Sequence, residues 1–309
     1  MKLGIIYAGQ GSQVVGMGKS FYPHPLFDEY PDLKELCFNG PLDRLSLTQN
    51  TQPCMVLVAS IITDLLKENG IIPDYCAGLS LGEYSALYCA DVFEQRQVIE
   101  LARFRGKVMN EAVQGIDSEM IAVIKMERDI LEDLCKQASS LGIVSISNYN
   151  CPGQLVVAGE KEAVEKVKEL ALEKGAKRVI PLNTSGPFHT ALLKEASLAL
   201  KERFQQETFH EMKIPVIFNT LGHELKNQTI PEILEKQVMS PVYFEDSIRY
   251  MINQGVDTII EVGPGIGALT QVLARYAGYV RSYEIDTRFK GVYDCLLYTS
   301  PSPRDTERS

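Results

Sequence analysis

The sequence lacks several features that would place it in other classes of protein. Its seven cysteines include no C-x-x-C pair and are odd in number, so we expect reduced thiols and neither a disulfide framework nor a zinc site. No apolar run approaches ~18 residues and no signal peptide is visible, so we expect a cytoplasmic protein without a membrane span. A net charge of −9 argues against nucleic acid as a general partner.

The first glycine-rich loop also lacks the signature of a phosphate site. Leu3–Ala8 is predicted to be a buried strand, and it ends in Gly9-Gln10-Gly11-Ser12-Gln13. The glycines would let this loop approach a ligand closely. It has neither the third glycine nor the Lys-Ser/Thr pair of phosphate-binding motifs, so we do not expect it to bind phosphate.

The sequence does contain Gly78-x-Ser80-x-Gly82, the spacing of a nucleophile elbow, after a short apolar run and before a helix-forming run. A strand that turns sharply into a helix strains the residue at the turn and leaves no room for side chains beside it, which explains the glycines. The serine hydroxyl then lies at a helix N-terminus, where unpaired N–H groups can stabilise an oxyanion. Such a match alone is more often an ordinary turn, but its strand–helix context makes Ser80 a candidate nucleophile.

Around this motif, apolar strands alternate with helical patterns, which indicates an α/β protein with a covered parallel sheet. Residues 20–50 are mixed and contain prolines, so short helices and loops are expected there. The other predicted elements of this body are strands over residues 3–8, 214–219 and 256–262 and helices over 51–69, 95–113, 190–206, 240–253 and 268–276.

Residues 118–184 have a different character. Strand, helix, strand, strand, helix and strand follow one another there, which is the order of a ferredoxin-like fold. We therefore expect a discontinuous body over residues 1–117 and 185–294 with a subdomain inserted over 118–184. The predicted strands cover residues 120–126, 142–148, 154–159 and 176–182, and the predicted helices cover 127–140 and 161–174.

The last fifteen residues do not enter the fold prediction. Residues 295–309 match the translation of a sequencing-library adapter, so we expect a non-native tail there. Their proline and serine content also fits an ordinary disordered tail.

Six motifs occur in order along the chain. Together they resemble the malonyl-CoA:acyl-carrier-protein transacylases of type II fatty acid synthesis, over residues 3–290. The resemblance implies an α/β-hydrolase-like parallel-sheet body with an inserted ferredoxin-like subdomain, no bound cofactor, no metal and a monomer. The motifs are Gly9-Gln10-Gly11-Ser12-Gln13, Gly78-Leu79-Ser80-Leu81-Gly82-Glu83, Arg105-Gly106-x-x-Met109, Asn150-x-Pro152-Gly153-Gln154, Gly186-Pro187-Phe188-His189 and Glu261-Val262-Gly263-Pro264-Gly265.

The resemblance also implies which groups react. Ser80 would attack the malonyl thioester and hold the malonyl group as an ester. His189, one of only four histidines, would act as the general base and then protonate the departing thiolate. The backbone carbonyl of Gln237 would orient His189, and the backbone N–H groups of Gln10 and Leu81 would form the oxyanion hole.

Arg105 lies on the predicted helix over residues 95–113, where a solvated surface charge is the commoner fate of an arginine. The resemblance instead implies a bidentate pair between Arg105 and the free carboxylate of the malonyl group. An acetyl group would leave that charge without its partner, which would give selectivity. Met109 would pack beside Arg105, and Phe188 and Asn150 would be further substrate-binding residues.

The resemblance thus implies an acyltransferase that moves the malonyl group from malonyl-CoA to the phosphopantetheine thiol of acyl carrier protein, for fatty acid biosynthesis. CoA phosphates and an acidic carrier protein would both favour basic residues near the site. Two alternatives stay open. A trans-acting acyltransferase of a polyketide pathway would use the same residues with another carrier, and a non-catalytic scaffold would only bind a carrier protein.

Overall fold

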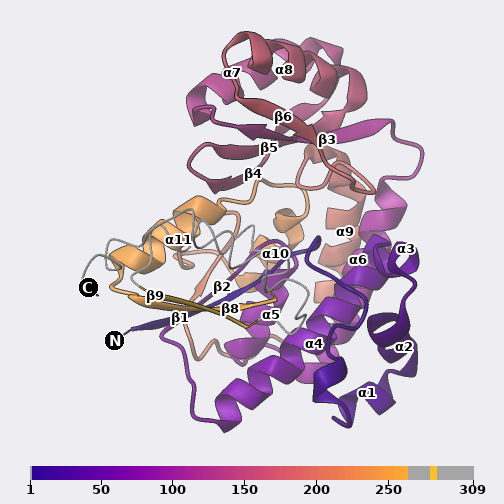
Figure 1. Cartoon of the computed structure of the whole chain (residues 1–309), viewed down its shortest axis with the longest axis vertical. Helices are drawn as coiled ribbons and strands as arrows, with labels where there is room; N and C mark the ends of the chain where they lie inside the picture. The colour runs from indigo at the N-terminus through magenta and orange to yellow at the C-terminus, as the bar shows by residue number, and fades with distance from the viewer. Residues whose placement is uncertain (1, 264–278, 284–309) are drawn as a thin grey trace, which may run out of the picture. The chain divides into compact units, whose positions relative to one another are not determined.

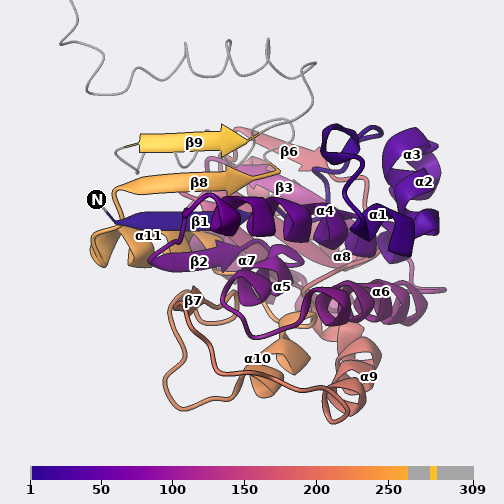
Figure 2. The ribbon, with the colours of Figure 1, turned by 90° about the horizontal axis from the view of Figure 1, so that it is seen from below.

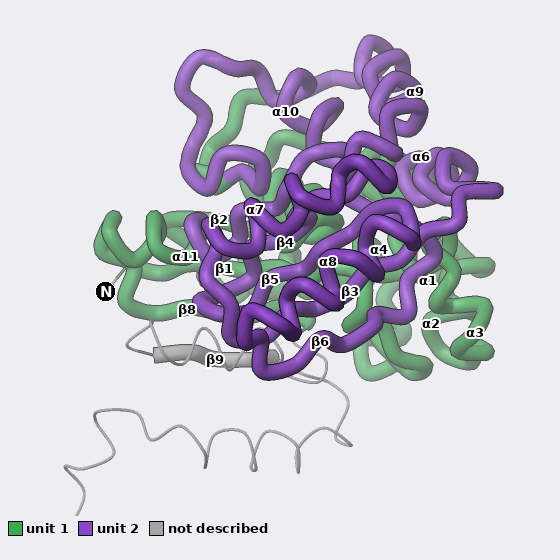
Figure 3. Tube along the Cα trace, turned by 90° about the horizontal axis from the view of Figure 1, so that it is seen from above, with its two compact units in different colours: residues 1–103, 210–217, 248–309 green, residues 104–209, 218–247 purple. Residues whose placement is uncertain are grey.

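The structure is a computed structural model that describes residues 2–263 and 279–283 (Figure 1). The chain forms two compact units, drawn in different colours in Figure 3. Unit 1 comprises residues 1–103, 210–217 and 248–309, and unit 2 comprises residues 104–209 and 218–247. Each unit is therefore assembled from segments that lie far apart in the sequence.

Unit 1 contains a parallel sheet, as the sequence predicts. Among the described residues its strands follow the order β7-β2-β1-β8-β9, and Figure 2 shows β8 and β9 pointing the same way. The central strand β1 buries Ile5 and Ile6 completely, as expected for a strand covered on both faces. The strands are β1 (Leu3–Tyr7), β2 (Tyr75–Gly78), β7 (Val216–Ile217), β8 (Thr258–Val262) and β9 (Tyr279–Tyr283).

The helices of unit 1 follow the predicted order. Short helices α1 (Leu26–Glu29), α2 (Pro31–Asn39) and α3 (Leu42–Leu45) precede the long α4 (Thr48–Glu68). Helix α4 packs against α5 (Gly82–Cys89), and α5 packs against β1 and β2. The end of β2 and the start of α5 are thereby fixed against the middle of the sheet.

Unit 2 contains an antiparallel sheet with the strand order β4-β5-β3-β6 in the described part of the chain. Helices α7 and α8 lie together on one face of this sheet (Figure 1). The β-α-β-β-α-β order confirms the predicted ferredoxin-like arrangement. The elements are β3 (Ser118–Ile124), α7 (Arg128–Ala138), β4 (Val144–Cys151), β5 (Gln154–Glu160), α8 (Lys161–Glu173) and β6 (Arg178–Pro181).

The rest of unit 2 consists of helices and the loops that join them. Helix α6 (Gln95–Ala112) ends in this unit, and α9 (Lys194–Phe204) packs against α10 (Ile230–Gln237). The domain boundaries expected from the sequence, with a subdomain over residues 118–184, stay a prediction. None of the helices that the structure describes combines the length and the apolar character needed to cross a bilayer.

One helix begins later than the sequence predicts. Helix α11 (Phe244–Asn253) does not include Ser240, Pro241 or Val242. The Val242 N–H donates to the Ser147 carbonyl over 2.8 Å, so this segment runs beside strand β4 instead of joining the helix. The helix predicted over residues 268–276 lies outside the described residues.

Candidate active site

The turn around Ser80 depends on two glycines. A Cβ atom on Gly78 would lie 2.0 Å from the carbonyl carbon of Gly82, and one on Gly82 would lie 2.2 Å from the Tyr7 carbonyl oxygen. Side chains do not approach backbone atoms that closely, so both positions require glycine. Because neither glycine has a side chain, the chain can turn sharply from the end of β2 into α5.

Ser80 has a strained backbone. Its φ of 52° lies in the left-handed region, which residues other than glycine seldom adopt. Ser80 is half-buried, and α5 begins two residues later at Gly82. A strained serine between a strand and a helix N-terminus is the geometry of a nucleophile elbow.

The glycine loop after β1 lies against this elbow. A Cβ atom on Gly9 would be 2.5 Å from the carbonyl oxygen of Leu79. The next residue, Gln10, is held by its side chain, whose Nε2 donates to Thr48 Oγ1 over 3.0 Å. Within unit 1, the structure therefore places the loop that contains Gln10 next to the turn that contains Leu81.

His189 occupies a tight turn in unit 2. Its φ is 63°, and its backbone N–H donates to the Val238 carbonyl over 3.0 Å. The turn is fixed on the other side by Thr190, whose Oγ1 donates to the Pro187 carbonyl over 2.7 Å. The imidazole is therefore held by a rigid backbone, and His189 is only 4% exposed.

The imidazole Nδ1 of His189 faces two carbonyl oxygens. It lies 2.9 Å from the Gln237 oxygen and 3.1 Å from the Ser240 oxygen. Because a carbonyl oxygen can only accept a hydrogen bond, Nδ1 must carry the proton and donate it. In the neutral ring, Nε2 is then the nitrogen that can take up a proton.

The surroundings keep this imidazole neutral. Burial, followed by the positive charge of Arg105, lowers the pKa of His189 to about 4. The hydrogen bonds to the Gln237 and Ser240 carbonyls oppose this change, because they favour the protonated ring. At neutral pH, His189 is therefore a base that has not yet been protonated.

Arg105 is fully buried, so the surface-charge alternative is wrong. Its Nη2 donates to Gln237 Oε1 over 2.9 Å, and Gln237 is itself fully buried. Gln237 therefore contacts Arg105 with its side chain and His189 with its backbone carbonyl. Unit 2 thus brings together three residues that the sequence analysis singled out.

Three other predicted site residues also lie in unit 2. Met109 follows Arg105 on α6 and is 1% exposed, and Phe188 precedes His189 and is buried. Asn150 lies near the end of β4, and its Oδ1 is buried with no hydrogen-bond partner among the described residues. Within that same part of the chain, no group of histidines, cysteines and carboxylates could hold a metal ion.

The sequence analysis missed Ser240 as a second carbonyl partner of His189. The available signal was Ser240-Pro241-Val242, which we interpreted as the start of a helix. Proline has no N–H and favours an extended residue before it, so the same motif is compatible with the extended segment that the structure shows.

Comparisons with known proteins identify the family of the chain. A family model described as "Acyl transferase domain" matches residues 5–275. The chain is 41% identical over 276 residues to a malonyl CoA-acyl carrier protein transacylase of Bacillus subtilis, covering 85% of this chain and 87% of that protein. A transacylase of the same name from Staphylococcus aureus is 36% identical over 278 residues, covering 85% of this chain and 89% of that protein.

Solved structures give the same result. The crystal structure of a malonyl CoA-acyl carrier protein transacylase from Clostridium perfringens superposes with a TM-score of 0.87 at 34% identity, covering 97% of this chain and 98% of that chain. Another match is a malonyl-transacylase in complex with its type II PKS acyl-carrier protein, with a TM-score of 0.85 at 33% identity, covering 97% of this chain and 100% of that chain. The chain belongs to the malonyl-CoA:acyl carrier protein transacylase family of acyltransferases.

Proposed function

We propose that this protein transfers the malonyl group of malonyl-CoA to the phosphopantetheine thiol of an acyl carrier protein, through a malonyl ester on Ser80. The contact of Gln237 with both Arg105 and His189 carries the proposal, because it joins a buried carboxylate-binding cation to a neutral base. The names of the relatives support the same substrate and carrier. They do not favour the trans-acting acyltransferase or the scaffold, although one of the named carriers is a type II PKS acyl-carrier protein.

The first half of the reaction uses Ser80 as the nucleophile. Its Oγ attacks the thioester carbonyl carbon while His189 Nε2 takes the hydroxyl proton. The carbonyl oxygen becomes an oxyanion, for which the backbone N–H groups of Gln10 and Leu81 are the proposed donors. The carbon–sulfur bond then breaks, and His189 returns the proton to the CoA thiolate.

The second half reverses these steps with a different thiol. The phosphopantetheine thiol gives its proton to His189 Nε2, and its sulfur attacks the ester carbonyl of malonyl-Ser80. The bond between carbon and Ser80 Oγ breaks, and His189 returns the proton to the serine. Neither half needs a metal or a bound cofactor to balance atoms and charge.

Arg105 is proposed to select the malonyl group. A guanidinium offers parallel N–H donors that match a carboxylate, so the free carboxylate of the malonyl group would neutralise this buried charge. An acetyl group has no carboxylate to offer to this buried guanidinium, so it would lack that interaction in the site. Met109, Phe188 and Asn150 are proposed to complete the substrate pocket.

The test is the intact mass of the protein after brief mixing with malonyl-CoA or, separately, with acetyl-CoA. We expect a malonyl adduct on the wild type, no adduct on Ser80→Ala and little acetyl adduct. A folded wild-type sample without any adduct would contradict the proposal. Retention of the adduct by Ser80→Ala would contradict the assignment of the nucleophile.

The role of Arg105 is tested by the same measurement on Arg105→Ala. We expect its preference for malonyl over acetyl to fall at least about 100-fold, because the interaction lost is specific to the carboxylate. An equal loss of both acylation rates would show that Arg105 only supports the fold. Incubation of the malonyl-loaded enzyme with a carrier protein then tests the second half of the reaction.

The cytoplasmic location that the sequence predicts stays a prediction.

A further inference from the structure

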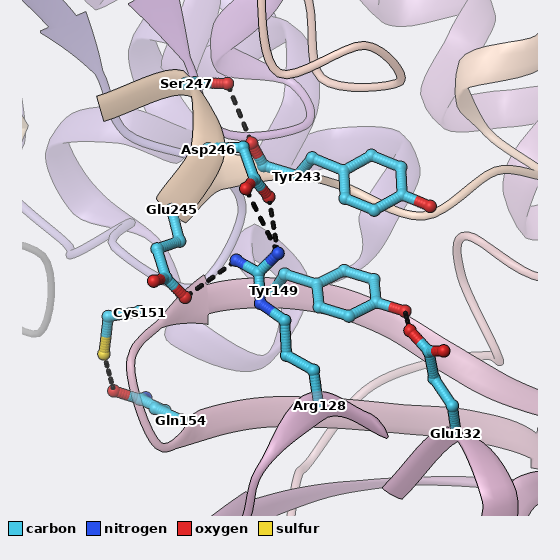
Figure 4. Close-up of polar contacts among 9 residues, drawn as sticks. All are labelled: Arg128, Glu132, Tyr149, Cys151, Gln154, Tyr243, Glu245, Asp246 and Ser247. Atoms are coloured by element: carbon cyan, nitrogen blue, oxygen red, sulfur yellow. Dashed lines mark hydrogen bonds and ion pairs between the residues drawn. The ribbon is translucent and has the colours of Figure 1, made fainter. Parts of the chain in front are cut away.

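Unit 2 contains a partly exposed cluster of ion pairs whose residues have no role in the reaction proposed above (Figure 4). Arg128, the first residue of α7, donates from Nη1 to both carboxylate oxygens of Asp246, over 3.1 Å and 2.9 Å. Its Nη2 donates to Glu245 Oε2 over 2.8 Å. One guanidinium therefore holds two neighbouring carboxylates at the start of α11.

The same guanidinium packs on an aromatic pair. Its central carbon lies 4.8 Å from the centre of the Tyr149 ring, within the range of a cation–π contact. Tyr149 stacks on Tyr243 with the ring centres 4.9 Å apart and an angle of 13° between the rings. The Tyr149 hydroxyl donates to Glu132 Oε1 over 2.8 Å, which anchors the pair to α7.

Backbone hydrogen bonds continue from this pair. The Tyr149 N–H donates to the Val242 carbonyl, and the Val242 N–H donates to the Ser147 carbonyl, each over 2.8 Å. The Tyr243 N–H donates to the Asn219 carbonyl, also over 2.8 Å. The segment before α11 is therefore hydrogen-bonded to strand β4 on one side and to Asn219 on the other.

This segment reaches His189 two residues earlier, at Ser240. The Ser240 carbonyl oxygen is one of the two that face His189 Nδ1, at 3.1 Å. Since Pro241 and Val242 follow directly, a shift of the Val242–Asp246 segment would move the Ser240 carbonyl with it. The ionic cluster and the histidine are thus connected through a short, hydrogen-bonded piece of backbone.

The ion pairs of this cluster contribute little to the stability of the fold. The Arg128 side chain is 31% exposed and Asp246 is 38% exposed, so solvent weakens these ion pairs. Two hydrogen bonds from Nη1 to Asp246, one bond from Nη2 to Glu245 and the Tyr149 ring against the guanidinium nevertheless allow little change in position. The cluster therefore fixes the positions of these side chains more than it stabilises the fold.

We propose that Arg128 is a positioning residue for His189. It fixes the Tyr243–Asp246 segment, which holds the Ser240 carbonyl in place to accept the hydrogen bond from Nδ1. The histidine then keeps the tautomer and the ring orientation in which Nε2 takes up protons. This inference rests on the proposed role of His189 as the base.

The test compares Arg128→Met with Arg203→Met. Arg203 is a matched control in unit 2, because its side chain is also 31% exposed, pairs with Glu207 at 2.6 Å and lies 5.4 Å from the centre of the Phe104 ring. We expect Arg128→Met to lower kcat between about 10- and 100-fold with an unchanged KM for malonyl-CoA, since small misplacements of a catalytic group cost this much. Arg203→Met should keep kcat within about 2-fold.

A second readout follows His189 without the reaction. In protein with labelled histidine, the Nδ1 proton of His189 should give a downfield signal in the NMR spectrum that is missing in His189→Asn. We expect Arg128→Met to shift and broaden this signal and Arg203→Met to leave it unchanged. If Arg128→Met does not fold, Asp246→Ala removes both acceptors of Arg128 Nη1 and serves for both measurements.

An unchanged kcat and an unchanged Nδ1 signal in the Arg128 variant would overturn the inference, and so would equal losses of kcat in both arginine variants. Failure of the proposed function looks different. The wild type would then form no malonyl adduct, or His189→Ala would keep full activity, whatever the Arg128 variant does to the Nδ1 signal.

Discussion

The surroundings of Ser80 in unit 1 and those of His189 in unit 2 are built by different means. The backbone sets the position of Ser80, because Ser80 itself has a strained φ and the two glycines beside it leave no room for a side chain. His189 also has a left-handed φ, but its ring is oriented by hydrogen bonds to carbonyl oxygens about 50 residues away in the sequence. Backbone shape places the proposed nucleophile, and hydrogen bonds orient the ring of the proposed base.

The two regions should therefore respond differently to mutation. A change near Ser80 meets backbone atoms, so it should damage the fold of unit 1 together with the site. A change near His189 removes one contact among several, so it should alter chemistry before it alters stability. The following predictions test this contrast, beginning with the largest expected effect.

Replacing His189 should have the largest effect on activity. We expect His189→Ala to slow acylation of Ser80 by malonyl-CoA about 10⁴-fold or more in single-turnover measurements, because no other base is assigned to the serine hydroxyl. The control is His210→Ala, since the His210 side chain is 47% exposed. A loss below 10-fold in His189→Ala would refute its role as the base.

Replacing Gly82 should have the largest effect on stability. A Cβ atom there would lie 2.2 Å from the Tyr7 carbonyl oxygen, so we expect Gly82→Ala to lower the free energy of unfolding by about 3 kcal/mol. The control is Gly70→Ala, where φ is 74° but no atom lies within 4 Å of the added Cβ. Strain alone should cost about 1 kcal/mol in that variant. Equal values from urea unfolding would remove the argument from close packing.

The free energy of unfolding should depend on pH through His189. Its pKa of about 4 in the folded protein lies below the ordinary value of 6.5, so between these values the unfolded chain binds a proton that the folded protein does not. Stability should therefore fall by up to about 3 kcal/mol as the pH drops from 6.5 to 4, and this contribution should be constant above 6.5. His189→Asn should lack this part of the dependence. Identical pH profiles of stability for the two proteins would contradict the burial of a neutral ring.

The smallest effect is expected for Gln237→Ala. This variant loses the Oε1 that accepts from Arg105 but keeps the backbone carbonyl that accepts from His189. We expect the acylation rate to fall less than about 10-fold, the cost of one hydrogen bond, and the Nδ1 signal of His189 to stay unchanged. Loss of that signal would show that the side chain, and not the carbonyl, orients the ring.

The same contrast explains how far the sequence could predict this protein. The spacing of Gly78, Ser80 and Gly82 predicts the turn because a side chain at Gly78 would clash with Gly82 within the same motif, although the contact of Gly82 with Tyr7 comes from the sheet. The alternation of strands and helices likewise predicts the parallel sheet and the ferredoxin-like order. These features depend on local patterns, so one sequence is enough to find them.

The surroundings of His189 could be predicted only in part. The resemblance pointed to the Gln237 carbonyl, but every carbonyl looks alike in a sequence, and Ser240 was assigned to a helix. Arg128 gave no signal either, because its role depends on Tyr149 and Asp246, which only the fold brings together. The helical pattern alone does not predict the burial of Arg105, since most arginines on helices are exposed, and only the resemblance indicated a buried guanidinium.

The link that Gln237 makes between Arg105 and His189 has a consequence for the timing of catalysis. The charge of Arg105 is one of the causes that weaken His189 as a base. If Arg105 binds the malonyl carboxylate, as proposed, the bound anion offsets that charge and the proton affinity of His189 rises. The correct substrate would then strengthen the very base that activates the serine. An acyl group without a carboxylate would meet a weaker base, so discrimination would extend from binding into the rate of the chemical step.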